Sequence, residues 1–265
     1  MRCFVLFSLL GSALCSAICF TAAAADLAPE EVIQKFAAKE AQFRKARESY
    51  TYRQSVKMEE LDGSGNVQGK WEEVDDIIFG PNKQREEKVI YAPMNTLHLI
   101  ITPQDLQDLR NVQPFVLTTD DISKYDIHYV GKQKVDEINC YQFNVKPIKM
   151  LKGERYFQGD IWVDDQDLQI VKTFGKGVGL LKRNEDNQFP AFETYREQID
   201  GKYWFPTYTR ANDTLHFKDS SQRIRMVVKY ENYKRFGSET NITFGDEVSD
   251  TSKDNKDNKE NKDKK

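Results

Sequence analysis

The side chains in this sequence that could carry out chemistry are three histidines, several grouped carboxylates and a glycine-rich stretch. The histidines, His98, His128 and His216, are far apart in the sequence and form no spaced metal-binding motif. The glycine-rich stretch, residues 175–179, superficially resembles a nucleotide-binding loop, but its spacing differs and no helical pattern follows it. The motifs of zinc proteases and serine hydrolases are absent. These residues therefore predict neither a metal centre nor a bound cofactor.

Four aspartates lie close enough in the sequence to suggest a calcium site. They are Asp160, Asp164, Asp165 and Asp167. Their spacing lacks the EF-hand pattern. Runs of strand-forming residues flank them at 155–163 and 168–174, so we expect a hairpin whose turn carries solvated aspartates.

Two glutamates on one face of a predicted strand, Glu193 and Glu197, could serve as an acid and a base. Pairing with Lys202 or Arg210 across a hairpin is the simpler interpretation. The sequence therefore predicts that the protein is not an enzyme. A secreted hydrolase that uses Glu193 or Glu197 remains as a third hypothesis.

Composition points to a soluble globular chain. It has 265 residues, a net charge of −3 and 31% charged residues. Such a small negative charge does not favour binding to nucleic acid or to an anionic membrane. We expect a monomer that binds no nucleic acid.

Both ends of the chain differ from its middle. Residues 1–25 contain an arginine, an apolar run and a stretch of small residues, and so predict a cleaved signal peptide and export to the periplasm. Retention as a membrane anchor in the envelope is the alternative. Residues 241–265 are dominated by charged and polar residues and predict a disordered tail. Residues 26–240 are left as a single domain, in which Cys140 is the one remaining cysteine and is expected to be an inert thiol in a strand.

The strongest local signal is the hairpin at residues 189–210. Asp200 and Gly201 favour a type I′ turn, which would pair Ile199 with Lys202. Large apolar side chains then occur on both faces of the hairpin. This pattern fits a curved sheet with something held inside it, and it fits a two-sided structural core equally well.

The remaining elements follow in chain order. Residues 29–48 predict an amphipathic helix that lies on a sheet. Residues 51–91 predict a meander, and residues 103–112 a short helix capped by Thr102. That helix could close the mouth of a barrel or simply pack on the sheet, and the loop at 175–187 is a second candidate lid. About ten antiparallel strands with two helices predict an α+β fold built on a sandwich or barrel.

An exported sheet rich in aromatic residues and poor in reactive groups predicts an apolar cavity larger than its own side chains fill. Acyl chains bind in such a cavity by transfer from water and need no catalytic residue. The residues expected in or near the cavity are Trp162, Tyr203, Trp204, Phe205, Met226 and Tyr230.

The segments at 157–172, 189–210 and 230–236 together resemble bacterial outer-membrane lipoprotein-sorting proteins, which are relatives of the periplasmic carrier LolA. The resemblance extends over residues 29–236. It implies an antiparallel unclosed β-barrel, an N-terminal helix and an inserted lid helix over a hydrophobic cavity for acyl chains. The arginine that helps to hold the lid closed in LolA cannot be matched to a position in this sequence.

Two functions follow as expectations. The first is a periplasmic carrier or binding protein for lipoproteins or other acyl-chain ligands. The alternative is an envelope sensor or regulatory module on the same barrel, similar to anti-sigma-factor regulators, with a membrane-anchored protein as its partner.

Overall fold

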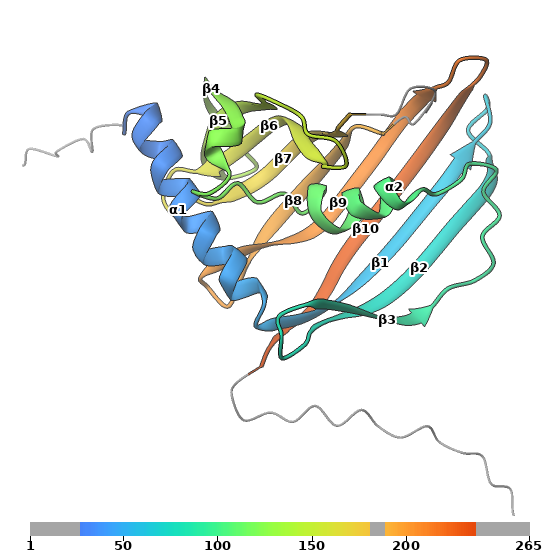
Figure 1. Cartoon of the computed structure of the whole chain (residues 1–265), viewed down its shortest axis with the longest axis horizontal. Helices are drawn as coiled ribbons and strands as arrows, with labels where there is room; N and C mark the ends of the chain where they lie inside the picture. The colour runs from blue at the N-terminus through green and yellow to red at the C-terminus, as the bar shows by residue number, and fades with distance from the viewer. Residues whose placement is uncertain (1–26, 181–188, 237–265) are drawn as a thin grey trace, which may run out of the picture.

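The computed structural model describes residues 27–180 and 189–236 (Figure 1). The predicted signal peptide and charged tail, and most of the second candidate lid, lie outside the described residues. None of the described helices is long and apolar enough to cross a membrane.

The described residues form one antiparallel sheet of ten strands, in the order β3-β2-β1-β10-β9-β8-β7-β6-β5-β4. The strands are β1 (Tyr50–Leu61), β2 (Val67–Phe79), β3 (Arg85–Tyr91), β4 (Tyr125–Val135), β5 (Ile138–Pro147), β6 (Tyr156–Asp164), β7 (Ile170–Val178), β8 (Phe192–Ile199), β9 (Tyr203–His216) and β10 (Ser221–Arg235). Strands β3 and β4 are the two edges and do not pair with each other, so the barrel is unclosed. The predicted α+β fold and strand number are confirmed.

Helix α1 (Pro29–Arg47) lies across one face of this sheet (Figure 1). Its start and end follow from local chemistry, because proline stands in the first turn, acidic residues follow it and basic residues occupy the last turn. The side chains of Val32, Phe36, Ala37 and Phe43 are fully buried, and the Phe36 ring lies 5.7 Å from that of Phe143 on β5. The helix is therefore fixed by apolar packing on the sheet.

The two faces of the sheet bury different clusters. The face covered by α1, called here the inner face, carries Ile161 and Ile170 in the main core. Their neighbours Trp162 and Val171 belong to a separate small cluster with Cys140. Because successive strand residues point to opposite sides, this second cluster lies on the outer face.

Two predictions about the late strands were wrong in detail. Ile199 pairs with Tyr203 instead of Lys202, because the loop has three residues, with Asp200 and Gly201 both at positive φ. Gly175 does not begin a loop, because β7 continues to Val178. At Gly175 the neighbouring strand approaches so closely that an added Cβ would meet the backbone of β6.

Candidate functional site

The site is built around residues 97–117, called here the lid segment, which crosses the inner face between β3 and β4. Its helix α2 (Pro103–Gln107) starts at Thr102, whose side chain accepts a hydrogen bond from the Asp105 backbone N–H in a capping box. A π-helical turn, η1 (Asp108–Val112), continues it. The predicted helix at residues 103–112 is therefore confirmed, with a π-turn in its second half. Such turns are rare in proteins, and those that occur often lie at functional sites.

The underside of the lid segment is apolar. Leu109, Val112 and Phe115 are buried in the main core, and Ile101 and Leu106 pack against it. The Phe115 ring stacks on Phe157 of β6 with centroids 4.5 Å apart. The segment therefore buries apolar side chains against the inner face of the sheet.

Two ion pairs hold the middle of the lid segment to distant parts of the sheet, one next to β6 and the other on β3. Asp108 accepts two hydrogen bonds from Arg155, at 2.9 and 2.6 Å, and the two side chains are 9% and 7% exposed. Two residues further on, Arg110 donates from Nε to Glu87 on edge strand β3 at 2.8 Å. The first pair is buried and the second is partly exposed, so the first contributes more to holding the segment down.

The ends of the lid segment are anchored separately. Near its start, the backbone N–H groups of His98 and Leu99 donate to the buried carboxylate of Glu60 on β1, at 3.0 and 2.6 Å. Burial acts to raise the pKa of Glu60, but these hydrogen bonds outweigh it and lower that pKa below its ordinary value. Near its end, Thr194 on β8 donates to the backbone carbonyl of Gln113 at 3.0 Å. Both ends of the lid segment are therefore tied to the sheet by contacts separate from those of its middle.

A buried ion pair joins this end of the lid segment to α1. Arg196 on β8 donates to Glu40 of α1 at 3.0 Å and also to the backbone carbonyl of Phe115. The two side chains are 1% and 0% exposed. The sequence prediction missed both residues. Arg196 therefore ties the end of the lid segment to α1.

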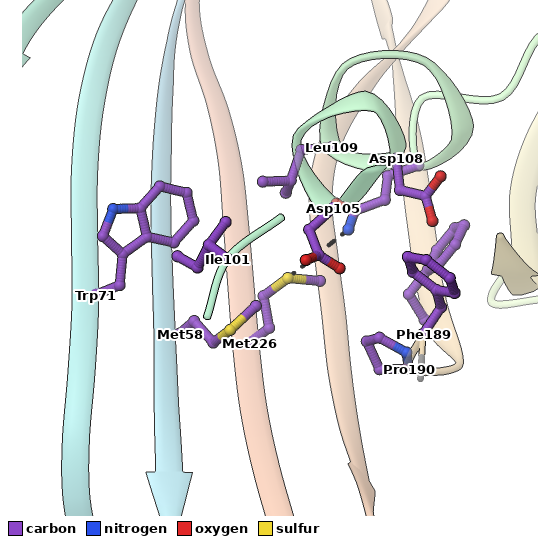
Figure 2. A pocket seen from close by; sticks show the side chains of 11 residues that line it. Met58, Trp71, Ile101, Asp105, Asp108, Leu109, Phe189, Pro190 and Met226 are labelled. Carbon is purple, nitrogen blue, oxygen red and sulfur yellow. Dashed lines mark hydrogen bonds between the residues drawn. The ribbon is translucent and has the colours of Figure 1, made fainter. Parts of the chain in front are cut away.

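Beneath the lid segment lies a small apolar cavity of about 20 Å³ (Figure 2). It is lined mainly by Met58, Trp71, Ile101, Leu109, Phe192 and Met226. A space of this size holds one water molecule. The expected acyl-sized hollow is therefore not found at this place, because the side chains of the lid segment fill it.

The six residues expected at the cavity lie in three places. Met226 lines the cavity, and Tyr230 is buried further along the same inner face of β10. Tyr203 and Phe205 pack at the C-terminal end of α1, where the Phe205 ring is 5.0 Å from Phe43. Trp162 and Trp204 belong to the outer-face cluster, and neither lines this cavity.

The candidate catalytic carboxylate Glu193 is held by cations. Arg210 donates to it from Nε at 2.7 Å, as the sequence suggested. The Nζ atom of Lys172 lies 2.5 Å from Oε1 of Glu193. Burial acts to raise the pKa of Glu193, but the bonds from Lys172 and Arg210 outweigh it and lower that pKa. An ionised, paired carboxylate does not fit a general acid at neutral pH.

The other reactive groups also have structural surroundings. Asp164 is buried and accepts from the backbone N–H of Asp167 at 2.8 Å, so it is not the solvated turn residue that we expected. Burial raises the pKa of the Cys140 thiol to about 12. Within residues 27–180 and 189–236, no group of three His, Cys, Asp or Glu side chains could hold a metal ion.

An acidic residue beside the lid segment leads to a pH-dependent prediction. Burial raises the pKa of Asp75 on β2 to about 6, and the neighbouring Glu73 adds to the shift. This exceeds the ordinary value of 3.8, so the folded protein favours the protonated acid, and ionisation destabilises the fold as the pH rises through about 4 to 6. Asp75→Asn should raise the free energy of unfolding by on the order of 1–2 kcal/mol at pH 8 and by much less at pH 4.

Urea unfolding at the two pH values measures this effect. Asp76→Asn is the matched control, because Asp76 is half-exposed and pairs with Arg53 at 2.8 Å. That change should lower stability by less than about 1 kcal/mol at pH 8. An equal gain for Asp75→Asn at both pH values would show that charge is not the cause.

Comparisons with known proteins place this structure among weakly similar folds. No family model and no curated protein matches the chain. A DUF1329 family protein from Desulfovibrio piger is 15% identical, with 81% of this chain and 96% of that chain covered and a TM-score of 0.41. A domain from Vibrio parahaemolyticus assigned to the outer membrane lipoprotein-sorting proteins is 13% identical, with coverages of 79% and 95% and a TM-score of 0.36. A LolA superfamily protein from Nitrosomonas europaea is 11% identical, with coverages of 76% and 94% and a TM-score of 0.34.

Identities and TM-scores this low carry no ligand and no partner over to this chain. The structures to which this chain is similar include LolA superfamily and lipoprotein-sorting proteins.

Proposed function

We propose that this protein is an exported carrier or binding protein that holds acyl chains of lipoproteins or other lipids between the inner face and the lid segment. The observation that carries the proposal is that the same segment has an apolar underside and a middle held by ion pairs. Its underside buries apolar side chains, whereas its middle is tied to the sheet by two ion pairs, Asp108–Arg155 and Arg110–Glu87.

If the middle of the lid segment lifted, the apolar surface of the sheet would exchange the side chains of that segment for a ligand's alkyl chain. Leu109 and Val112 would leave the sheet, and an alkyl chain would cover the surface that they vacate on Trp71 and Met226. Each buried methylene contributes about 0.8 kcal/mol, so a chain of about twelve methylenes would supply roughly 10 kcal/mol to offset the opening. The flexible side chains of Met58 and Met226 suit a cavity that must repack around different chains.

Export to the periplasm is part of this proposal. It is supported by the signal-peptide pattern of residues 1–25. A periplasmic location would place the protein where acyl chains must cross water between two membranes.

Fluorescent fatty-acid uptake by the delipidated mature protein tests the proposal. We expect saturable binding of one fatty acid per protein. Met226→Ala should weaken binding about 5- to 30-fold, because it removes apolar contact worth roughly 1–2 kcal/mol. Trp204→Ala, on the outer face, is the matched control and should leave affinity unchanged.

Circular dichroism of both variants must first show that they remain folded. Absence of saturable uptake by the unaltered protein, or equal loss in the two variants, would contradict the proposal. Capture of a membrane-anchored protein from the envelope without any lipid uptake would support the regulatory alternative instead.

A further inference from the structure

One buried amide beneath the lid segment has a hydrogen-bonding atom without a partner. Gln113 is 4% exposed, and no group among the described residues donates to its Oε1. Its Nε2 lies 3.7 Å from the sulfur of Met226, which is a weak acceptor. A buried polar atom left unpaired destabilises the fold, so its presence at a cavity calls for an explanation.

The backbone holds Gln113 in a fixed position. Its N–H donates to the carbonyl of Asp108 at 2.8 Å and closes the π-turn, while its carbonyl accepts from Thr194 at 3.0 Å. The hydroxyl oxygen of Thr194 in turn lies 2.8 Å from the hydroxyl oxygen of Thr209 on β9. Gln113 therefore belongs to the anchored end of the lid segment and would stay against the sheet when the middle lifts.

The other polar groups at this cavity are already satisfied. Asp105 accepts from Thr102 within the capping box, and Asp108 is paired with Arg155. The rest of the lining is largely apolar (Figure 2). Gln113 lines this cavity, so its buried amide, with an unpartnered Oε1, is a hydrogen-bonding group beside a largely apolar space.

We propose that Gln113 is a specificity residue that accepts a hydrogen bond from an N–H donor next to the alkyl chain of the ligand. The cavity would then prefer long-chain secondary amides to the corresponding esters. An ester offers acceptors only, and so leaves the Gln113 Oε1 unpaired. This inference rests on the proposed function, because it requires an alkyl chain beneath the lid segment.

Three probes that differ in one group test the inference. N-methylhexadecanamide carries the N–H, N,N-dimethylhexadecanamide keeps the amide carbonyl without it, and methyl hexadecanoate is the ester. Each is measured by displacement of a fluorescent fatty acid from the delipidated protein. The secondary amide should bind about 5- to 20-fold more tightly than the other two.

Gln113→Met keeps the side-chain length and removes the acceptor. It should reduce the preference for the secondary amide over the ester to less than about 2-fold. Gln107→Met, an exposed change on α2, is the control and should keep the full preference.

The outcomes separate the two proposals. Equal binding of all three probes by the unaltered protein overturns the role of Gln113 and leaves the acyl-chain carrier standing. Absence of binding by every probe and by the fluorescent fatty acid overturns both. The comparison of probes on the unaltered protein needs no variant, so it remains decisive even if Gln113→Met fails to fold.

Discussion

Replacing Glu40 by alanine is expected to lower the free energy of unfolding by about 3–5 kcal/mol, because it leaves the guanidinium of Arg196 buried without its counter-charge. Both side chains are at most 1% exposed. Glu40 also accepts from the backbone N–H of Ile170 on β7 at 3.3 Å, so its loss removes a tie between α1 and two strands. Urea unfolding measures the change. Glu31→Ala is the matched control on the same helix, because Glu31 is 50% exposed and pairs with Lys35. That change should lower the free energy of unfolding by less than about 0.5 kcal/mol.

A double variant shows what the pair does beyond its own charges. Glu40→Met with Arg196→Leu removes both buried charges, and such replacements are often neutral or stabilising. Here we expect only partial recovery, because Arg196 also donates to the carbonyl of Phe115. Full recovery would mean that this bond to the lid segment contributes little, and an effect below about 1 kcal/mol for Glu40→Ala alone would contradict the whole account.

Elements whose boundaries depend on local chemistry were predictable from the sequence. Pro29 and the acidic residues after it mark the start of α1, and Thr102 with Pro103 marks that of α2. The strands were recognisable because turn residues separate short runs of β-branched and aromatic side chains. These signals act within a few residues, so no knowledge of tertiary packing was needed to read them.

The inner face could not be assigned from the sequence because both faces carry aromatic side chains. Alternation shows that Trp204 and Phe205 point in opposite directions, but not which of them faces α1. The Phe43 ring decides the question, since it lies 5.0 Å from Phe205. Likewise, nothing local indicated that the lid segment fills the space expected for a ligand.

The ion pair between α1 and β8 left a signal in the sequence that was overlooked. Glu40 falls within the apolar stripe of α1, four residues after Phe36 and three before Phe43. Arg196 alternates with Phe192 and Thr194 on β8, so it also points inward. A charged residue at a core position requires a partner of opposite charge. Glu40 in the apolar stripe of α1 therefore predicts a basic partner, and the fold identifies that partner as Arg196 on β8.

Asp108→Asn is expected to release the middle of the lid segment without unfolding the sheet. The change leaves Arg155 with a neutral partner in a buried site when the segment is down, whereas lifting would return Arg155 to water. Breaking such a pair costs about 3–5 kcal/mol, which would raise the population of the lifted state by at least about 10²-fold. Gly177→Ala, on β7, should disturb the same Asp108–Arg155 ion pair, because a methyl group at that position would clash with the Asp108 carboxylate.

Native-state hydrogen exchange resolves where the protection is lost. Amides of residues 104–112 should exchange about 10²- to 10³-fold faster in Asp108→Asn, while those of β5 and β6 should change far less. Arg110→Gln is the matched control on the same turn, and because Arg110 is 42% exposed it should change the rates less than about 5-fold. A uniform loss of protection across the sheet would identify the Asp108–Arg155 pair as a support of the whole fold. A loss confined to the lid segment would identify it as a latch on that segment, as the proposed entry of an acyl chain beneath it requires.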